Sequence, residues 1–144
     1  MTSVYAFASV DFIFTHPAQG QYSAQGEGLG DITITMTNDV SAHNLASDGS
    51  VMISRIEAKN ATITMTIQQT SAMNRWLERL YNYLQTAPND QWAAASIVLN
   101  DRLNNDRTTC TGVSFQKRPD LSYQQQGQQR SWTLMAATVE KQIA

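Results

Sequence analysis

Side chains that could do chemistry are few in this sequence, and they lie far apart. The two histidines, His16 and His43, each lie in a predicted loop or hairpin arm and have no partner at the spacing of a helical metal site such as His-x-x-x-His. The single cysteine, Cys110, excludes an internal disulfide and a thiolate metal cluster. Its setting in Thr-Thr-Cys-Thr-Gly-Val is strand-like and favours a small buried hydrophobe. We therefore predict no metal ion and no cofactor.

Nucleophiles and paired acids are equally hard to find. The 12 acidic residues are scattered, mostly where strands end or turn, and no pair stands out as the two carboxylates of a glycosidase would. The sequence contains no Gly-x-Ser-x-Gly elbow. Gly26, Gly28 and Gly30 alternate, but no Lys-Ser or Lys-Thr pair follows them, as a phosphate-binding loop requires. We predict that the chain is not an enzyme.

Charge is scarce as well. Charged residues make up 15% of the sequence, against about 25% in an ordinary globular protein. The polar surface must therefore come from Thr, Ser, Asn and Gln, which suits extended contact with other protein. The net charge of -2 excludes the broad basic surface on which tight nucleic-acid binding rests.

Length and composition indicate one domain over residues 1–144, because no linker or shift in composition divides the 144 residues. The N-terminal residues lack the basic start of a signal peptide. No run approaches the roughly 18 apolar residues of a membrane span. We expect residence in a cytoplasm by default and no membrane partner.

Alternating apolar and polar residues predict the main strands, because successive side chains of a strand point to opposite faces. Residues 4–14 place Val10, Phe12 and Phe14 on one face. Ile and Met alternate with Thr in residues 32–37 and 61–67, and Trp132, Leu134 and Ala136 alternate with Ser131, Thr133 and Met135 in the last strand, residues 130–138. Between the first two strands, Pro17 and the glycines up to Gly30 predict a long loop.

Two hairpins join these strands. Asp48-Gly49 predicts a two-residue type I′ turn between arms at residues 40–46 and 51–57. The modest apolar content of these arms cannot bury much within one small domain, so the hairpin could project from it. A second hairpin is expected from residues 96–101 and 108–116.

One helix is predicted after Ser71, a suitable N-cap, and ends near Pro88. Its apolar residues recur every three or four positions, as on the buried side of an amphipathic helix. They are Met73, Trp76, Leu77, Leu80, Tyr81 and Leu84. About seven strands and one helix predict a mainly β fold, an antiparallel β-sandwich or barrel with one flanking α-helix.

Several segments together resemble a known family, the tail tube proteins of contractile-tailed bacteriophages, in the branch of short myovirus tube subunits. The residues that carry the likeness are Ile32-Thr33-Ile34-Thr35-Met36-Thr37, Ala46-Ser47-Asp48-Gly49-Ser50-Val51-Met52, Thr62-Ile63-Thr64-Met65-Thr66 with the helix that follows it, Cys110 to Tyr123, and Trp132-Thr133-Leu134. They span nearly the whole chain in the right order. The most specific segment is Pro119-Asp120-Leu121-Ser122-Tyr123, which comes before a last strand that contains Trp.

The resemblance implies a structural subunit of a virion tail tube, assembled in the host cytoplasm. Such subunits form hexameric rings whose inner sheets join into one barrel. The rings stack inside a tail sheath, and a tape-measure protein and DNA pass through the lumen. On this basis we expect Thr33, Thr35, Thr37, Thr62, Thr64 and Thr66 to face the lumen, Asp48, Gly49, Val51 and Met52 to contact a neighbouring ring or subunit, and Arg75, Glu78 and Arg79 to face the sheath.

Two other classes stay open at this point. A tube subunit of a tailocin or a type VI secretion system would share this architecture and this sequence pattern. A small-molecule-binding β-barrel is a different class, in which Trp76, Trp92 and Trp132 could line a pocket.

Overall fold

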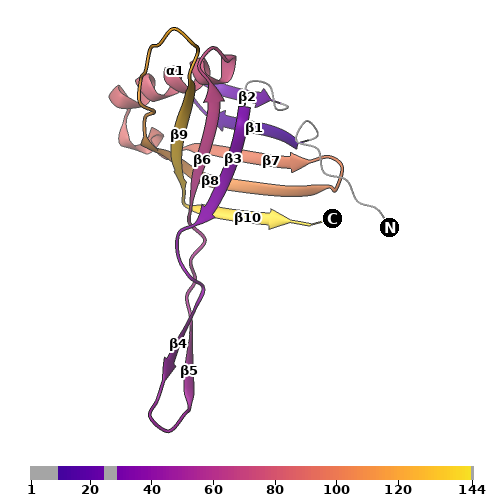
Figure 1. The fold of residues 1–144 in the computed structure, drawn as a ribbon, viewed down its shortest axis with the longest axis vertical. Coiled ribbons are helices and arrows are strands. Elements are labelled where there is room, and N and C mark those ends of the chain that lie inside the picture. Colours follow the sequence, from indigo (N-terminus) through magenta and orange to yellow (C-terminus); the bar gives the residue numbers. More distant parts are fainter. Residues whose placement is uncertain (1–9, 25–28, 144) are drawn as a thin grey trace.

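The computed structural model describes residues 10–24 and 29–143, and the main chain in this part is mostly antiparallel β (Figure 1). The strands are β1 (Val10–His16), β2 (Gly20–Ala24), β3 (Leu29–Met36), β4 (Ser41–Leu45), β5 (Val51–Arg55), β6 (Ala61–Gln68), β7 (Ala95–Asp101), β8 (Asp106–Lys117), β9 (Gln129–Ala136) and β10 (Thr138–Gln142). Helix α1 (Ala72–Thr86) and a 3-10 turn, η2 (Asn89–Gln91), separate β6 from β7. The predicted mainly β class with one α-helix is confirmed.

Eight of these strands form one folded sheet in the order β2-β1-β7-β8-β9-β6-β3, with β10 paired to β8. The front sheet consists of β3, β6, β9 and the end of β8, and the back sheet of β2, β1, β7, β10 and the start of β8. In Figure 1 the strands of the front sheet run vertically and those of the back sheet run across them. The 12-residue β8 belongs to both layers and joins them.

The corner between the layers lies at Gly112. Its φ is +64°, in the left-handed region that favours glycine, and a Cβ built on it would lie 2.7 Å from the Cβ of Ala137. The amide of Ala137 donates to the carbonyl oxygen of Thr111 at 3.0 Å. The chain changes sheet at the same place, because β9 ends at Ala136 and β10 begins at Thr138. The prediction of a single last strand over residues 130–138 was therefore wrong.

The core lies between the two sheets and under α1. The predicted alternation is confirmed in β6, where the Ile and Met side chains are buried and the Thr side chains are not, and in β9. Ser71 caps α1, since its Oγ accepts a hydrogen bond from the Asn74 amide at 3.1 Å. The fully buried large side chains are Phe12, Phe14, His16, Ile63, Met65, Ile67, Met73, Leu77, Leu80, Ile97, Trp132 and Leu134.

The tryptophans do not gather around a pocket. Trp132 contacts the ring of Phe115 with centroids 5.4 Å apart, Trp76 contacts Phe14 at 4.9 Å, and Trp92 is exposed. Four clefts of the described part of the chain are lined by other residues and by none of the three. Packing against aromatic neighbours accounts for both buried rings.

Three further sequence expectations need correction. The expected loop from residue 17 to residue 30 contains β2 and the beginning of β3; Gly26 and Gly28 lie outside the described residues. The described residues form ten strands rather than about seven. His16 is not in a loop but is the buried last residue of β1, where its Nε2 donates to the Gln91 carbonyl at 3.0 Å and its Nδ1 accepts from the Ala18 amide at 3.0 Å. The expected strand residues before Val10 also lie outside the described part.

Candidate assembly surfaces

The outer side of the front sheet is a face of hydroxyl groups. Across β3 and β6, Thr33 lies opposite Thr64 and Thr35 opposite Thr62. Across β6 and β9 the row continues, with Thr64 opposite Thr133. Cross-strand partners point to the same side of a sheet, so these side chains share the side away from the buried Ile and Met residues. The hydroxyl face consists of Thr33, Thr35, Thr62, Thr64, Thr66, Ser114, Ser131 and Thr133. The exposed Met135 lies among them, opposite Thr62 and Ser114.

Charge is confined to the margins of the hydroxyl face. Asp31 lies opposite Thr66 on the β3 side, and Lys117 lies opposite Thr133 on the β8 side. One acid and one base leave the face almost neutral. Thr37, which was predicted with this group, lies one residue beyond the end of β3, where its amide donates to the Asn60 carbonyl at 3.2 Å.

The β4–β5 hairpin projects from the body as an isolated two-stranded arm (Figure 1). It leaves from the end of β3 and returns into β6, so it continues the long direction of the front sheet. The predicted projecting hairpin is thus present, but its turn is not of type I′. Among its residues only Gly49 has a positive φ, +91°, and the Gly49 amide donates to the Ala46 carbonyl at 3.0 Å. This is a three-residue loop that ends in a left-handed glycine.

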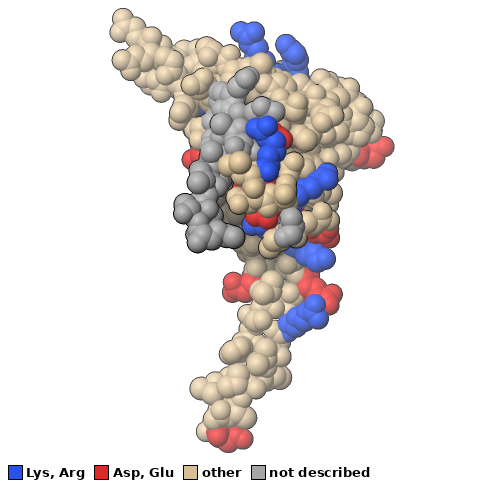
Figure 2. Space-filling view, turned by 90° about the vertical axis from the view of Figure 1, so that its right-hand side faces the viewer, with Lys and Arg blue, Asp and Glu red and all other residues tan. Residues whose placement is uncertain are grey.

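Every residue of the two arm strands is exposed. Leu45 is 72% exposed, Ile53 66% and Met52 60%. Between residues 41 and 54 the only charged residue is Asp48, and Figure 2 shows the arm as uncharged surface with an acidic tip. The hydroxyl and the amide of Ser50 donate to the Asp48 carboxylate at 2.7 and 3.0 Å, and these bonds lower the pKa of Asp48. The tip therefore stays anionic.

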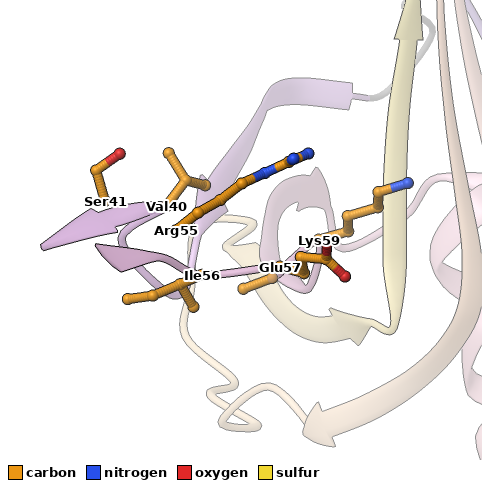
Figure 3. Close-up of a pocket in the computed structure, with 7 residues that line it drawn as sticks. Val40, Ser41, Arg55, Ile56, Glu57 and Lys59 are labelled. Atoms are coloured by element: carbon orange, nitrogen blue, oxygen red, sulfur yellow. The ribbon is translucent and has the colours of Figure 1, made fainter. Parts of the chain in front are cut away.

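A cleft of about 610 Å³ lies at the base of the arm (Figure 3). Val40, just before β4, and Ile56, just after β5, line it beside charged side chains, and the Lys59 ammonium pairs with Glu140 of β10 at 3.8 Å. The lining residues are Val40, Ser41, Arg55, Ile56, Glu57, Ala58 and Lys59. No cofactor chemistry is apparent in this set, whereas the exposed Val40 and Ile56 suit contact with another protein surface.

The outer side of α1 carries the predicted charged residues, but they are not equivalent. Arg75 and Arg79 are exposed, whereas Glu78 is half-buried and forms an ion pair with Arg118 at 2.7 Å. The Arg118 guanidinium also lies 5.6 Å from the centre of the Tyr81 ring. Glu78 therefore holds the segment after β8 against the helix, and the two arginines form the free part of this surface.

The end of the body opposite the arm carries a glutamine-rich loop, residues 121–128. Arg130, almost fully buried, secures it by donating to the Ser122 carbonyl at 3.0 Å and by stacking 5.5 Å from the centre of the Tyr123 ring. Leu121 is 49% and Tyr123 78% exposed. This end thus presents apolar side chains as the arm does.

Sequence reasoning missed the buried polar groups that hold this arrangement together. The Trp132 indole donates to Asn74 Oδ1 at 3.0 Å, and Asn74 Nδ2 donates to the Gln69 carbonyl at 3.2 Å. Alternation with Trp132 and Leu134 would have placed Arg130 on the buried face of β9. The signal for Asn74 was its position beside Met73 on the buried side of the helix.

Groups that could act on a substrate are not brought together in the part of the chain that the structure describes. No three His, Cys, Asp or Glu side chains there gather as metal ligands would. Burial raises the pKa of the Cys110 thiol to about 11, which leaves it un-ionised and unreactive near neutral pH. No described helix has the length and apolar character needed to cross a membrane. The features of the described residues that could serve a function are therefore surfaces for contact: the hydroxyl face, the arm and the outer side of α1.

Comparison with known sequences identifies the family to which a chain with these surfaces belongs. Residues 2–144 match the sequence family described as bacteriophage PhiTE tail tube protein. The chain belongs to that tail tube family. The resemblance noted from its segments is therefore confirmed over nearly its whole length, and the chain is a tail tube subunit. No curated protein sequence matches it significantly.

Solved structures of contractile injection systems share the tube subunit's fold. The cap that terminates the tube of the anti-feeding prophage has a TM-score of 0.60 at 14% identity, and the match covers 100% of this chain and 93% of that one. The anti-feeding prophage baseplate gives 0.58 at 10% identity, covering 99% and 97%. The sheath-tube complex of an extracellular contractile injection system, PVC, gives 0.55 at 11% identity, covering 92% and 88%. At these identities the likeness shows the fold alone.

Proposed function

We propose that the tube subunit assembles into hexameric rings that stack into the inner tube of a contractile phage tail. The observation that carries this proposal is the hydroxyl face, a mostly polar and nearly neutral side of a sheet whose other side is core; Met135 is an exposed apolar side chain within it. A face of this kind suits the wall of a water-filled passage. Membership of the tail tube family supplies the context.

Ring closure would use the margins of the front sheet. In the described part of the chain β3 pairs only with β6, so its outer backbone groups form an open edge. An open edge strand is a template for pairing with another chain, and a closed barrel removes it. We infer that the β3 edge of one subunit joins the front sheet of the next, which would make the hydroxyl faces continuous around the lumen.

The neutral wall suits transit. DNA is retained by surfaces that gather Lys and Arg against its phosphates, whereas the hydroxyl face has one Lys and one Asp at its margins. DNA, and a tape-measure protein during assembly, would pass such a wall without being trapped. Asp48, Gly49, Val51 and Met52 would contact the neighbouring ring, since they form the end of the arm.

The outer surface of the ring would carry α1. Arg75 and Arg79 are free to pair with acidic groups of a tail sheath protein, whereas Glu78 is already engaged with Arg118. One structural neighbour comes from a sheath-tube complex, which supports a sheath as the partner. The particle would be a virion tail, assembled in the host cytoplasm.

Cysteine accessibility tests the position of the hydroxyl face. Purified protein should form tubes of uniform width in electron micrographs. In such tubes Thr35→Cys should react with a small maleimide but not with a maleimide on a large polymer, because the polymer cannot enter the lumen. Asn82→Cys, on the exposed side of α1, is the matched control and should react with both. The native Cys110 is buried and contributes no background. Equal labelling of both positions by the polymer would refute a luminal hydroxyl face.

A tube that exports protein instead of DNA is the second candidate, favoured by the structural neighbours from injection systems. Native particles separate the two. Tubes joined to DNA-filled capsids indicate a phage tail, and tubes with sheath and baseplate but no capsid indicate an injection system or a tailocin.

A further inference from the structure

A cleft of about 480 Å³ lies beside the loop of residues 121–128, which Figure 1 shows at the end of the body opposite the arm. Arg75 of α1, Arg118 of the segment after β8 and Arg130 of β9 line it, and Glu78 is the single acid among its described lining residues. Three positive side chains and one negative one give the lining a formal charge of +2, whereas the whole chain carries -2. We call this site the arginine cleft.

Arg130 is the buried member of the three arginines. The residue is 2% exposed, and the partners of its guanidinium are neutral, since it donates to the Ser122 carbonyl at 3.0 Å and stacks on the Tyr123 ring. Among the described residues no carboxylate forms an ion pair with it. A buried charge without a counter-charge is costly. An anion in the arginine cleft would offset this cost.

The other charged groups of the cleft also leave N–H donors to spare. Arg118 binds Glu78 through Nη2 at 2.7 Å, but its Nε is buried and has no hydrogen-bond partner among the described residues. Arg75 is exposed, and no described acid forms an ion pair with it. The carboxylate of Glu78 is already engaged. What remains is a set of guanidinium donors from three segments, which suits an oxyanion.

The same cleft also has an apolar margin. Leu121 and Tyr123 line it and are 49% and 78% exposed. A free phosphate ion would use only the guanidinium donors and would leave this margin in water. A carboxylate carried by a peptide chain could use both, because a neighbouring apolar side chain would cover Leu121 and Tyr123.

We propose that the arginine cleft binds the carboxylate of an acidic side chain on a partner protein, with an apolar residue of that partner beside it. Arg130 and Arg118 would hold the carboxylate, since guanidinium groups pair with carboxylates through two parallel hydrogen bonds. Arg75 would attract it from the surface. The site belongs to a single chain, so the inference does not depend on rings or tubes.

Fluorescence anisotropy tests the site on the full, unassembled chain. The probe is a fluorescein-labelled peptide in which glutamate and leucine alternate, and the matched peptide has glutamine in place of each glutamate. The chain should bind the first and not the second, and added salt should weaken the binding because charges are screened.

Three variants of the chain locate the bound peptide. Arg130→Met should raise the Kd about tenfold or more, as expected for the loss of hydrogen bonds to a charged group. Arg75→Gln should raise it about two- to fivefold, as expected for an exposed ion pair. Arg79→Gln is the matched control, because Arg79 is exposed on the same helix but does not line the arginine cleft; it should change the Kd by less than about twofold. Arg75 is on the surface, so its variant keeps the test independent of any effect of Arg130→Met on folding.

Several results would overturn the inference. Equal binding of the glutamate and glutamine peptides would show that no carboxylate is recognised. Equal losses from Arg75→Gln and Arg79→Gln would show attraction by surface charge in general. Inorganic phosphate that binds where the glutamate peptide does not would identify a site for a free oxyanion instead. Wild-type protein that forms no tubes would refute the proposed function, and it would leave this binding measurement unaffected.

Discussion

The bend at Gly112 gives the most direct test of the fold. In the Gly112→Ala variant the new Cβ would lie 2.7 Å from the Cβ of Ala137, where ordinary contact between carbon atoms begins at about 3.5 Å. The left-handed backbone costs an L-residue about 1–2 kcal/mol, and overpacking of this kind costs about 1–3 kcal/mol. We therefore expect Gly112→Ala to lower the free energy of unfolding by about 2–5 kcal/mol.

A double-mutant cycle separates the two causes. Ala137→Gly removes the atom that the new methyl group meets, at a cost of its own of roughly 0.5–1 kcal/mol. The double variant should therefore regain the part of the free energy of unfolding that was lost to the steric clash, but not the part lost to the left-handed backbone. The expected coupling energy is about 1 kcal/mol or more. Urea unfolding of the unassembled chain, followed by tryptophan fluorescence, measures all the free energies.

Gly127→Ala is the matched control, because a Cβ at Gly127 meets no atom within 4 Å. It should change the free energy of unfolding by less than about 0.5 kcal/mol. A Gly112→Ala variant as stable as Gly127→Ala, or a cycle with no coupling, would show that the bend does not require glycine and does not depend on contact with residue 137.

Three further predictions follow from groups inside the body. Asn74→Leu leaves the buried Trp132 indole without its acceptor at 3.0 Å and should cost about 1–3 kcal/mol in urea unfolding; a loss under about 0.5 kcal/mol would mean that the bond is dispensable. Ser71→Ala removes the N-cap of α1 and should cost about 1 kcal/mol, whereas Ser71→Asp should retain most of the stability. Burial raises the pKa of Cys110 from 9.0 to about 11, so above pH 9 the thiol ionises in the unfolded chain but not in the folded one. The free energy of unfolding should therefore fall by up to about 1.4 kcal/mol per pH unit between pH 9 and pH 11, relative to a Cys110→Ala variant that lacks this contribution. Parallel pH profiles of the two proteins would contradict it.

The parts of the fold that local pattern controls could be predicted from the sequence. Strict alternation in β6 and β9 identified both strands and their buried faces, and the stripe behind Ser71 identified α1 and its cap. The same alternation identified the threonines of the hydroxyl face. These assignments succeed because one face of each element is buried in the core. The period of the hydrophobic pattern therefore indicates both the type of element and its buried face.

The parts that failed depend on contacts between distant segments. β2 was taken for loop because Gly20–Ala24 has no alternation, and it is a strand only through its pairing with β1. Nothing local marks the break at Ala137, which is set by hydrogen bonding to β8. Asp48-Gly49 is compatible with more than one tight turn, so composition located the turn but not its type. Local pattern located the candidate surfaces, whereas their roles came from the family resemblance and stay predictions until the assemblies are examined.

The continuity of β8 through both sheets has a mechanical consequence. In a sandwich whose layers are joined only by loops, a shear force can slide one layer over the other by disturbing side-chain packing alone. Here such sliding would have to deform a covalent strand at its corner, so the two layers must move together. A tube built from these subunits would therefore resist bending and torsion as a single layer and not as two layers that can slide. Such stiffness would suit an inner tube that has to stay straight while a sheath contracts around it.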